Sequence, residues 1–450
     1  MKKQLKVVSF LLTIILTVGA LPVFAAPPRQ TARYELPFEM NVASCILVSL
    51  DTGEVIFEKN ADVQRPPASL TKLMTSYLVF KYVDDIDGTM VTAKPYIYDE
   101  FYGLGVSTAD IRKGETLSMR DLLYAMLLPS GNEAASMVAD YIGNGSISNF
   151  NMLMTTEAKK LGCKNTNFNN PHGLFSENHY SSAYDMYLIA KACYETPGFM
   201  EIASTRIYEL PANVKHAQSY NIISTIRMMD KASPVYRSYV KGMKTGSLPE
   251  AGHNFVTLCE KNGEKYILVL MGVEPTDVDG TQLSDRPSFD MTIKIMDYFF
   301  DSYTLKAANS MSTPSAEVKL KYAKETDTLM LYPKTEVYSV LPKDVDESSF
   351  QKTYELPETV SAPVAAGDVI GTVSYFIAGS LVGTTDLVCE TAYERDSFIF
   401  MVEKIKEAFT SLYFKVVLGL CAGLVVLFFS YRYYIGKRYE KMQKVHRRTK

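Results

Sequence analysis

The spacing of apolar residues predicts strands at both ends of the segment 43–303 and helices between them. Residues 43–50 form an apolar run, and the turn Asp51-Thr52-Gly53 separates it from a second run at 54–58, which predicts a β-hairpin. In the middle of the segment, apolar residues recur every three or four positions, as on the buried face of a helix. The helices predicted from this spacing cover residues 69–83, 120–128, 132–142 and 184–194.

Strand patterns return after residue 235. Residues 239–247 lead into two apolar runs, 255–260 and 265–273, which flank the turn Lys261-Asn262-Gly263 and predict another hairpin. A helical pattern follows at 289–303. This order of hairpin, helices, strands and closing helix predicts an α+β fold, in which helices pack on a mostly antiparallel sheet that the first and last segments share.

The last third of the chain has a different pattern. A polar stretch at 307–316 predicts a linker, because it contains Ser and Pro and has no period. Short strand patterns follow and predict a small all-β domain at 316–392. The pattern at 394–410 predicts an amphipathic helix next to a membrane. Residues 411–431, uncharged apart from Lys415, are long enough for one transmembrane helix.

The two termini predict where the chain is located. Residues 1–25 have the parts of a secretory signal peptide, namely three lysines, an apolar run and the small-residue cleavage pattern Val23-Phe24-Ala25, with an uncleaved anchor as the alternative. Residues 432–450 carry eight Lys and Arg but one Glu, which predicts a cytoplasmic tail. We therefore expect a single-pass protein of the cell membrane, with residues 26 to about 410 outside the cytoplasm.

Composition narrows the function classes. A hydrophobic content of 47% is too high for a disordered chain. Because the basic residues gather at the two ends, the segment between them is acidic and offers no electrostatic footprint for nucleic acid. The six cysteines are far apart, without Cys-x-x-Cys, and no His-Glu-x-x-His is present. We therefore expect buried single thiols, with one disulfide left open, and no metal or other cofactor.

The first candidate motif is Ser69-x-x-Lys72. Pro66-Pro67 blocks a helix before Ser69, and an amphipathic helix is predicted to start there. Residues i and i+3 share a helix face, so the hydroxyl and the amine can meet, and the helix N-terminus favours developing negative charge. On its own the pattern is weak, because two other Ser-x-x-Lys stretches occur and a serine N-cap with a solvated lysine explains it more simply.

Two further motifs follow along the chain. Ser130-Gly131-Asn132 lies in the predicted loop between two helices, and alone it is typical of an N-cap and turn. Lys244-Thr245-Gly246 occurs once, on the predicted strand before a hairpin, where glycine allows another backbone or a ligand to come close. Alone, an edge-strand lysine explains the third motif equally well.

Together, the set and order of the three motifs resemble the penicillin-recognising serine acyl enzymes. Within that superfamily the chain is similar to the low-molecular-mass penicillin-binding proteins that are serine-type D-alanyl-D-alanine carboxypeptidases. The resemblance implies a β-lactamase/transpeptidase-like catalytic domain. Further stretches that carry the resemblance are Asp51–Val55, Asn169–Leu174, His179–Asp185 and Gly242–Gly246.

The resemblance implies catalytic roles that suit the chemistry of the residues. Ser69 would be the nucleophile, which needs an adjacent base. Lys72 can be that base if burial and the neighbouring charge of Lys244 lower its pKa. Ser130 can relay a proton to the leaving amine, and Asn132 can hold a substrate carbonyl together with Lys72.

The resemblance also implies a substrate-binding set and the ligands it takes. Lys244 and Thr245 can bind a terminal carboxylate, and Gly246 lets the strand approach the substrate. The family's oxyanion hole uses the backbone N–H groups of the nucleophile and of the residue after this strand motif, here Ser69 and Ser247. The implied substrate is a peptidoglycan stem peptide ending in D-Ala-D-Ala, and the implied inhibitors are β-lactams. Many relatives have a bulkier residue at the position of Ser247, so the substrate preference stays open.

Three other functions remain as alternatives: a β-lactamase, an enzyme acting on cross-links, and a catalytically silent wall-binding scaffold. The extra β domain and the anchor argue against the first, and the complete motif set argues against the last. The predicted organisation is a signal peptide at 1–25, a catalytic domain at 36–305, a β domain at 316–392 that serves as a spacer or a docking module, an amphipathic helix at 394–410, a transmembrane helix at 411–431 and a basic tail at 432–450.

Overall fold

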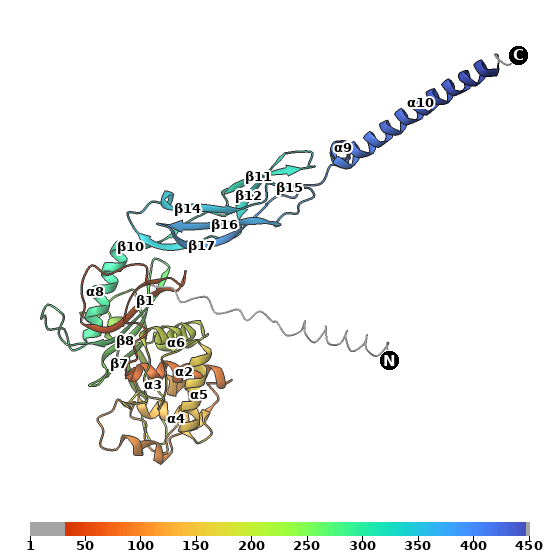
Figure 1. Ribbon diagram of the computed structural model, residues 1–450. Helices are drawn as coiled ribbons and strands as arrows, with labels where there is room; N and C mark the ends of the chain where they lie inside the picture. The colour runs from red at the N-terminus through yellow and green to blue at the C-terminus, as the bar shows by residue number, and fades with distance from the viewer. Residues whose placement is uncertain (1–31, 447–450) are drawn as a thin grey trace, which may run out of the picture. The chain divides into compact units, whose positions relative to one another are not determined.

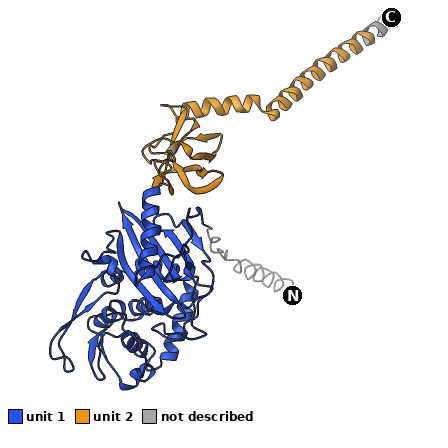
Figure 2. Ribbon diagram, turned by 90° about the vertical axis from the view of Figure 1, so that its left-hand side faces the viewer, with its two compact units in different colours: residues 1–304 blue, residues 305–450 orange. Residues whose placement is uncertain are grey.

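The computed structural model describes residues 32–446, so the predicted signal peptide lies outside the described residues. The chain forms two compact units, which divide between Thr304 and Leu305 (Figure 2). The first unit mixes helices and strands, and the second is rich in strands and ends in two helices. The predicted α+β fold is therefore confirmed, and each unit is described by itself below.

A five-stranded antiparallel sheet forms the centre of the first unit. The strand order is β2-β1-β9-β8-β7, so the N-terminal hairpin pairs with strands formed about two hundred residues later (Figure 1). This pairing confirms the prediction that the first and last segments share one sheet. The strands are β1 (Val42–Ser49), β2 (Val55–Lys59), β7 (Val240–Leu248), β8 (Gly252–Lys261) and β9 (Glu264–Val273).

Helices cover both faces of this sheet. Phe255 of β8 packs edge-on against Phe289 of α8 (Pro287–Ser302). The next residue, Val256, belongs instead to the main core, in which α6 (Ala183–Glu195) lies against β1 and β9. Because successive side chains of a strand point to opposite faces, this alternation fixes the register of the sheet.

The helix α2 (Thr71–Tyr82) runs through the middle of the helical side and is buried along most of its length. The prediction of an amphipathic helix starting at Ser69 is wrong in two respects. Residues Ala68–Leu70 form a separate 3-10 turn, η1, and four polar residues of α2 are buried, namely Thr71, Lys72, Thr75 and Ser76. Their polar atoms are paired within the core, since Thr75 Oγ1 donates to Pro171 O and Ser76 Oγ donates to Lys72 O.

Further helices and two small hairpins complete the first unit. The spacing did not predict α5 (Ile147–Lys160). Its buried apolar stripe, formed by Phe150, Met154 and Ala158, is narrow and is bordered by polar residues. The remaining elements are α3 (Met119–Leu127), α4 (Asn132–Ile142), α7 (Phe199–Ala203), the hairpin of β3 (Met90–Thr92) and β4 (Thr116–Ser118), the hairpin of β5 (Ile207–Leu210) and β6 (Tyr220–Ile223), and the 3-10 turns η2 (Pro95–Phe101) and η3 (Arg227–Met229).

The second unit is built on a six-stranded sheet of order β14-β16-β17-β12-β11-β15. Its inward side chains, among them Leu331, Val373 and Leu387, form a separate hydrophobic core. The pattern missed β14 and β15, which are short and mostly exposed. The elements are β10 (Tyr303–Ala307), β11 (Ala316–Lys321), β12 (Thr328–Pro333), β13 (Tyr338–Pro342), η4 (Glu347–Ser349), β14 (Gln351–Glu355), β15 (Thr359–Ser361), β16 (Val369–Ile377) and β17 (Ser380–Val388).

Two helices end the described chain. The helix α9 (Ser397–Thr410) is capped by the Asp396 carboxylate and exposes Phe398, Met401, Ile405 and Phe409. The last helix is α10 (Leu412–His446). Its segment 412–441 is the one helical segment of the described range that is long and apolar enough to cross a membrane. It extends well beyond the predicted span at 411–431, because the basic residues that follow continue the helix.

None of the six cysteines, all of which lie in the described range, forms a disulfide. Five of them are buried, and Cys421 is exposed on α10. Burial raises the pKa of the Cys45 thiol to about 12, which keeps it protonated and inert at neutral pH. The prediction of buried single thiols is confirmed for these five, and the alternative of one disulfide is not realised.

A close approach at Gly173 generates a prediction about stability. Gly173 has a φ of 94°, and a Cβ there would lie 1.8 Å from Ala68 O. We expect Gly173→Ala to lower the free energy of unfolding of the first unit by more than about 3 kcal/mol, because backbone must move. Gly53 is the matched control, since its φ of 74° is similar but a Cβ would meet nothing within 4 Å. Gly53→Ala should cost about 1 kcal/mol. Denaturant unfolding measures both variants, and equal losses would contradict the close approach.

Candidate active site

The amine of Lys72 is the point at which the first two sequence motifs meet. Its Nζ lies 3.0 Å from Ser69 Oγ, 2.7 Å from Asn132 Oδ1 and 2.7 Å from the backbone oxygen of His172. Lys72 is fully buried, whereas Ser69 is partly exposed. The structure therefore brings together the first two predicted motifs around one amine, and it adds a backbone partner that the sequence did not indicate.

Ser69 is held in the short turn η1 rather than on a regular helix. Ala68 before it has a φ of 50°, and Asn254 of β8 donates from Nδ2 to the oxygens of Pro66 and Pro67. Asn254 Oδ1 in turn accepts from Gly272 N, so this one side chain ties the turn to the sheet. The sequence analysis missed Asn254, because nothing nearby in the sequence marks its long-range role.

The strand β7 passes next to Ser69 and carries the third motif. A Cβ on Gly246 would lie 3.2 Å from Ser69 N, which explains why glycine stands at this position. Lys244 is fully buried, and its Nζ donates to Thr245 O at 3.1 Å. Thr245 is buried, and Ser247 is exposed, with Oγ 3.4 Å from His253 Nδ1.

The loop between α3 and α4 carries Ser130 in a strained conformation. Ser130 has a φ of 69°, its Oγ is buried, and this atom has no hydrogen-bond partner among the described residues. Gly131 N donates to Ala125 O, and a Cβ on Gly131 would lie 2.8 Å from that oxygen. A hydroxyl that is fixed and unpaired in this way is available to a ligand.

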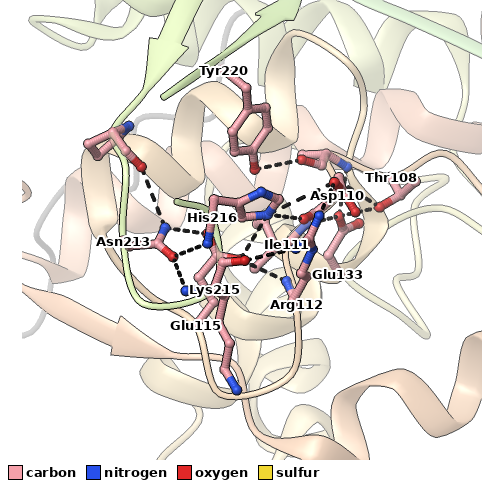
Figure 3. A network of polar contacts seen from close by, with 12 residues as sticks. Thr108, Asp110, Ile111, Arg112, Glu115, Glu133, Asn213, Lys215, His216 and Tyr220 are labelled. Carbon is pink, nitrogen blue, oxygen red and sulfur yellow. Dashed lines mark hydrogen bonds and ion pairs between the residues drawn. The ribbon is translucent and has the colours of Figure 1, made fainter. Parts of the chain in front are cut away.

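A network of polar contacts ties the segment 107–111 to the start of α4, directly after the Ser130 loop (Figure 3). Glu133, the residue after Asn132, accepts from Thr108 Oγ1 at 2.5 Å and from Ala109 N at 2.6 Å. Asn132 N also donates to Ser107 O. The segment 107–111 is thus bound to the start of α4, and this binding fixes the side chain of Asn132 next to Lys72.

The same segment is held from its other side by the β5–β6 hairpin. His216 Nε2 lies 2.9 Å from Asp110 O, and Tyr220 OH donates to Ala109 O at 3.0 Å. Asn213 Nδ2 donates to the buried carboxylate of Glu115 (Figure 3). None of these residues touches Ser69, and the sequence analysis named none of them, since each acts only through the fold.

Burial and neighbouring charge set the protonation of the two lysines. Burial, followed by the positive charge of Lys244, holds the pKa of Lys72 well below its usual range, while Glu133 opposes the shift. Burial, followed by the guanidinium of Arg286, lowers the pKa of Lys244 to about 7. Arg286 stands directly before α8, and the sequence analysis did not name it.

His179 of the segment 163–182 has a structural role. His179 Nε2 lies 2.8 Å from Thr71 Oγ1, and Asn169 N donates to His179 Nδ1. Burial lowers the pKa of His179 to about 3, so it is neutral.

Neither the carboxylate of Asp185 nor a metal centre extends the site within the described residues. Asp185 accepts from the backbone N–H groups of Lys164 and Asn165 and has no hydrogen bond to Lys72 or Lys244. Across residues 32–446, no group of three or more His, Cys, Asp or Glu is placed to hold a metal ion.

Comparisons with known proteins agree with this geometry. The family of D-alanyl-D-alanine carboxypeptidases matches residues 30–275, and the C-terminal domain of penicillin-binding protein 5 matches residues 300–395. The D-alanyl-D-alanine carboxypeptidase DacF of Bacillus subtilis is 26% identical over 397 residues, which cover 88% of this chain and 96% of that protein.

Two solved structures extend the comparison. Penicillin-binding protein 5 from Haemophilus influenzae has a TM-score of 0.61 at 26% identity and covers 80% of this chain and 100% of its own. The Streptomyces K15 DD-transpeptidase has a TM-score of 0.53 at 26% identity, with 59% of this chain and 100% of its own covered. Since the family match spans more than half of the sequence and includes Ser69, Lys72 and Lys244, this chain belongs to the D-alanyl-D-alanine carboxypeptidase family of serine peptidases.

Proposed function

We propose that this chain removes the terminal D-alanine from peptidoglycan stem peptides through an acyl-enzyme on Ser69. The observation that carries the proposal is the set of three partners around Lys72 Nζ. A neutral amine has two N–H donors and one lone pair. Asn132 Oδ1 and His172 O accept the two N–H groups, which leaves the lone pair for the proton of Ser69 Oγ.

The acylation step follows from this arrangement. Ser69 Oγ attacks the carbonyl carbon of the D-Ala-D-Ala peptide bond and gives its proton to Lys72 Nζ. The proton then reaches the nitrogen of the leaving D-alanine through the unpaired hydroxyl of Ser130. Among the described residues, Lys72 is the one titratable side chain hydrogen-bonded to Ser69, so we assign it as the base for the attacking water as well.

Recognition of the substrate is proposed for the strand β7 and its neighbours. Lys244 and Arg286 supply positive charge for the terminal carboxylate, and Thr245 supplies a hydroxyl donor. The N–H groups of Ser69 and Ser247 form the oxyanion hole, and Asn132 also binds a substrate amide. A Cβ on Gly246 would lie 3.2 Å from Ser69 N, so β7 passes close to Ser69, which supports this pairing of the two N–H groups.

Family membership supports hydrolysis of D-Ala-D-Ala over the β-lactamase and silent-scaffold alternatives. Transfer to a second amine starts from the same acyl-enzyme, and the Streptomyces K15 relative is a DD-transpeptidase by name. Product analysis separates the two reactions, because hydrolysis leaves a shortened acid and transfer leaves a new amide. β-Lactams are the expected inhibitors, since they acylate the same hydroxyl.

For the rest of the chain we propose the organisation that the sequence predicts, with a catalytic domain at 36–305, a β domain at 316–392 acting as a spacer, and α10 as a single membrane anchor. The apolar helix and the basic residues after it support the anchor, with the catalytic domain outside the cytoplasm. The signal peptide at 1–25 and the tail at 432–450 are part of the same proposal.

The nucleophile is tested by D-alanine release from a peptide ending in D-Ala-D-Ala and by covalent labelling with fluorescent penicillin. Ser69→Ala should abolish both signals, because no other hydroxyl contacts Lys72 Nζ among the described residues. Ser238, which is exposed and begins another Ser-x-x-Lys stretch, is the matched control, and Ser238→Ala should retain both. Labelling that persists in Ser69→Ala would refute the assignment.

The two lysines predict a bell-shaped pH profile of kcat/KM. Activity should rise with pH as Lys72 loses its proton, because the base must be neutral. It should fall above about pH 7, where Lys244 loses the charge that attracts the carboxylate. Lys244→Arg keeps a charge at all pH values and should shift the alkaline limb upward. An alkaline limb that is identical in Lys244→Arg would contradict this role.

Membrane anchoring is tested by truncation. The full chain should sediment with membranes and resist extraction by high salt, whereas a chain ending at Arg395 should stay in the soluble fraction with its penicillin labelling intact. A chain ending at Thr410 retains the exposed apolar side chains of α9 and should bind membranes in a form that milder treatment releases. Sedimentation of the Arg395 chain with membranes would argue against α10 as the anchor.

A further inference from the structure

Thr225, which lies outside the sheet, contacts Thr245 of the predicted carboxylate site. Thr225 Oγ1 lies 2.7 Å from Thr245 Oγ1, a separation at which one hydroxyl donates to the other. Thr225 stands between β6 and the turn η3, and the sequence motifs do not include it. Its partner Thr245 lies on β7, an edge strand that pairs only with β8 in the sheet.

The backbone around Thr225 is fixed on both sides. Thr225 N donates to Leu128 O, just before the Ser130 loop, and its own oxygen accepts from Arg227 N. The flanking residues Ser224 and Ile226 are buried. Thr225 is therefore held against the end of α3 and against β7 together, and its hydroxyl has a set place.

The chemistry of the ligand decides which hydroxyl donates. A carboxylate only accepts hydrogen bonds, and a threonine hydroxyl has one proton but can accept two bonds. If Thr245 gave its proton to Thr225, it would turn a lone pair toward the carboxylate and repel it. If Thr225 donates instead, the proton of Thr245 is free for the ligand, and the chain of two hydroxyls is polarised in the direction of the negative charge.

We propose that Thr225 is a positioning residue for the terminal carboxylate, whose hydroxyl donates to Thr245 Oγ1 and directs the Thr245 proton toward the ligand. This inference rests on the proposed function, because it presumes that the carboxylate binds at Thr245. It adds a source of specificity. Lys244 and Arg286 attract any anion, whereas an oriented O–H donor favours a carboxylate over an amide or an ester at the same place.

The test compares ligands with and without the charge, using the full chain in detergent. Thr225→Val removes the hydroxyl and keeps the shape, and Thr225→Ser is the matched control that restores the hydroxyl. The first readout is kcat and KM for D-alanine release from an acylated D-Ala-D-Ala peptide. The second is the rate of Ser69 acylation by benzylpenicillin and by its methyl ester, which lacks the carboxylate charge.

Thr225→Val should raise KM for the free-acid peptide roughly fivefold, the effect of one lost hydrogen bond, while kcat changes less than about twofold. Acylation by benzylpenicillin should slow by a similar factor, and acylation by the methyl ester should slow clearly less, because a neutral ester accepts a weaker hydrogen bond. Thr225→Ser should restore the wild-type ratio of the two penicillins. Thr225→Ala replaces the valine variant in the same comparisons if the valine variant does not fold.

Two outcomes would overturn the inference. One is equal slowing with benzylpenicillin and its ester, which would indicate a structural role only. The other is an unchanged ratio in both hydroxyl-free variants. The penicillin pair keeps this test separate from the proposed function. If the wild-type chain released no D-alanine, the carboxypeptidase proposal would fail, and the ratio of acid to ester would still decide the role of Thr225.

Discussion

Burial of one amine is the constraint on which the site depends. Taking the amine of Lys72 out of water is unfavourable unless each of its hydrogen-bonding positions is paired. The three partners come from three separate segments: the η1 turn, the start of α4, and the loop that contains His172. Each of these segments must reach its final position before the amine is fully paired, so the base of the proposed reaction exists only in the assembled first unit.

Several residues of the site have strained backbone conformations. Ala68 and Ser130 have φ values of 50° and 69°, and Met243, next to Lys244, has a φ of 95°. Each left-handed conformation of a residue with a side chain costs about 1 to 2 kcal/mol. The surrounding core offsets this cost, since α2 and the sheet are buried on nearly every side. At Ser130 the strained backbone coincides with a buried hydroxyl that has no hydrogen-bond partner among the described residues, so strain is found where a group is available to a ligand.

The sequence predicted the parts of the fold and site that have a local signature. The sheet of β1, β7, β8 and β9 follows from apolar runs and turns, and the three motifs contain the residues named for the site. Contacts made by backbone atoms or across long separations were missed. The oxygen of His172 belongs to a peptide group that every residue has, so no residue type marks it. Asn254 and Thr225 act through partners well removed in sequence, and only the register of β7 against β8 and the path of the β5–β6 hairpin bring them to the site.

The site also indicates why the proposed enzyme would release one ligand and retain another. Burial is the main cause that holds the pKa of Lys72 low, so the amine is available as a base before and after acylation. When D-alanine leaves, its carboxylate leaves with it, and water can enter the space beside the acyl group. In a β-lactam the carboxylate and the opened ring stay attached to the acyl group. They lie in the path of water, so the acyl-enzyme persists because the site is still occupied.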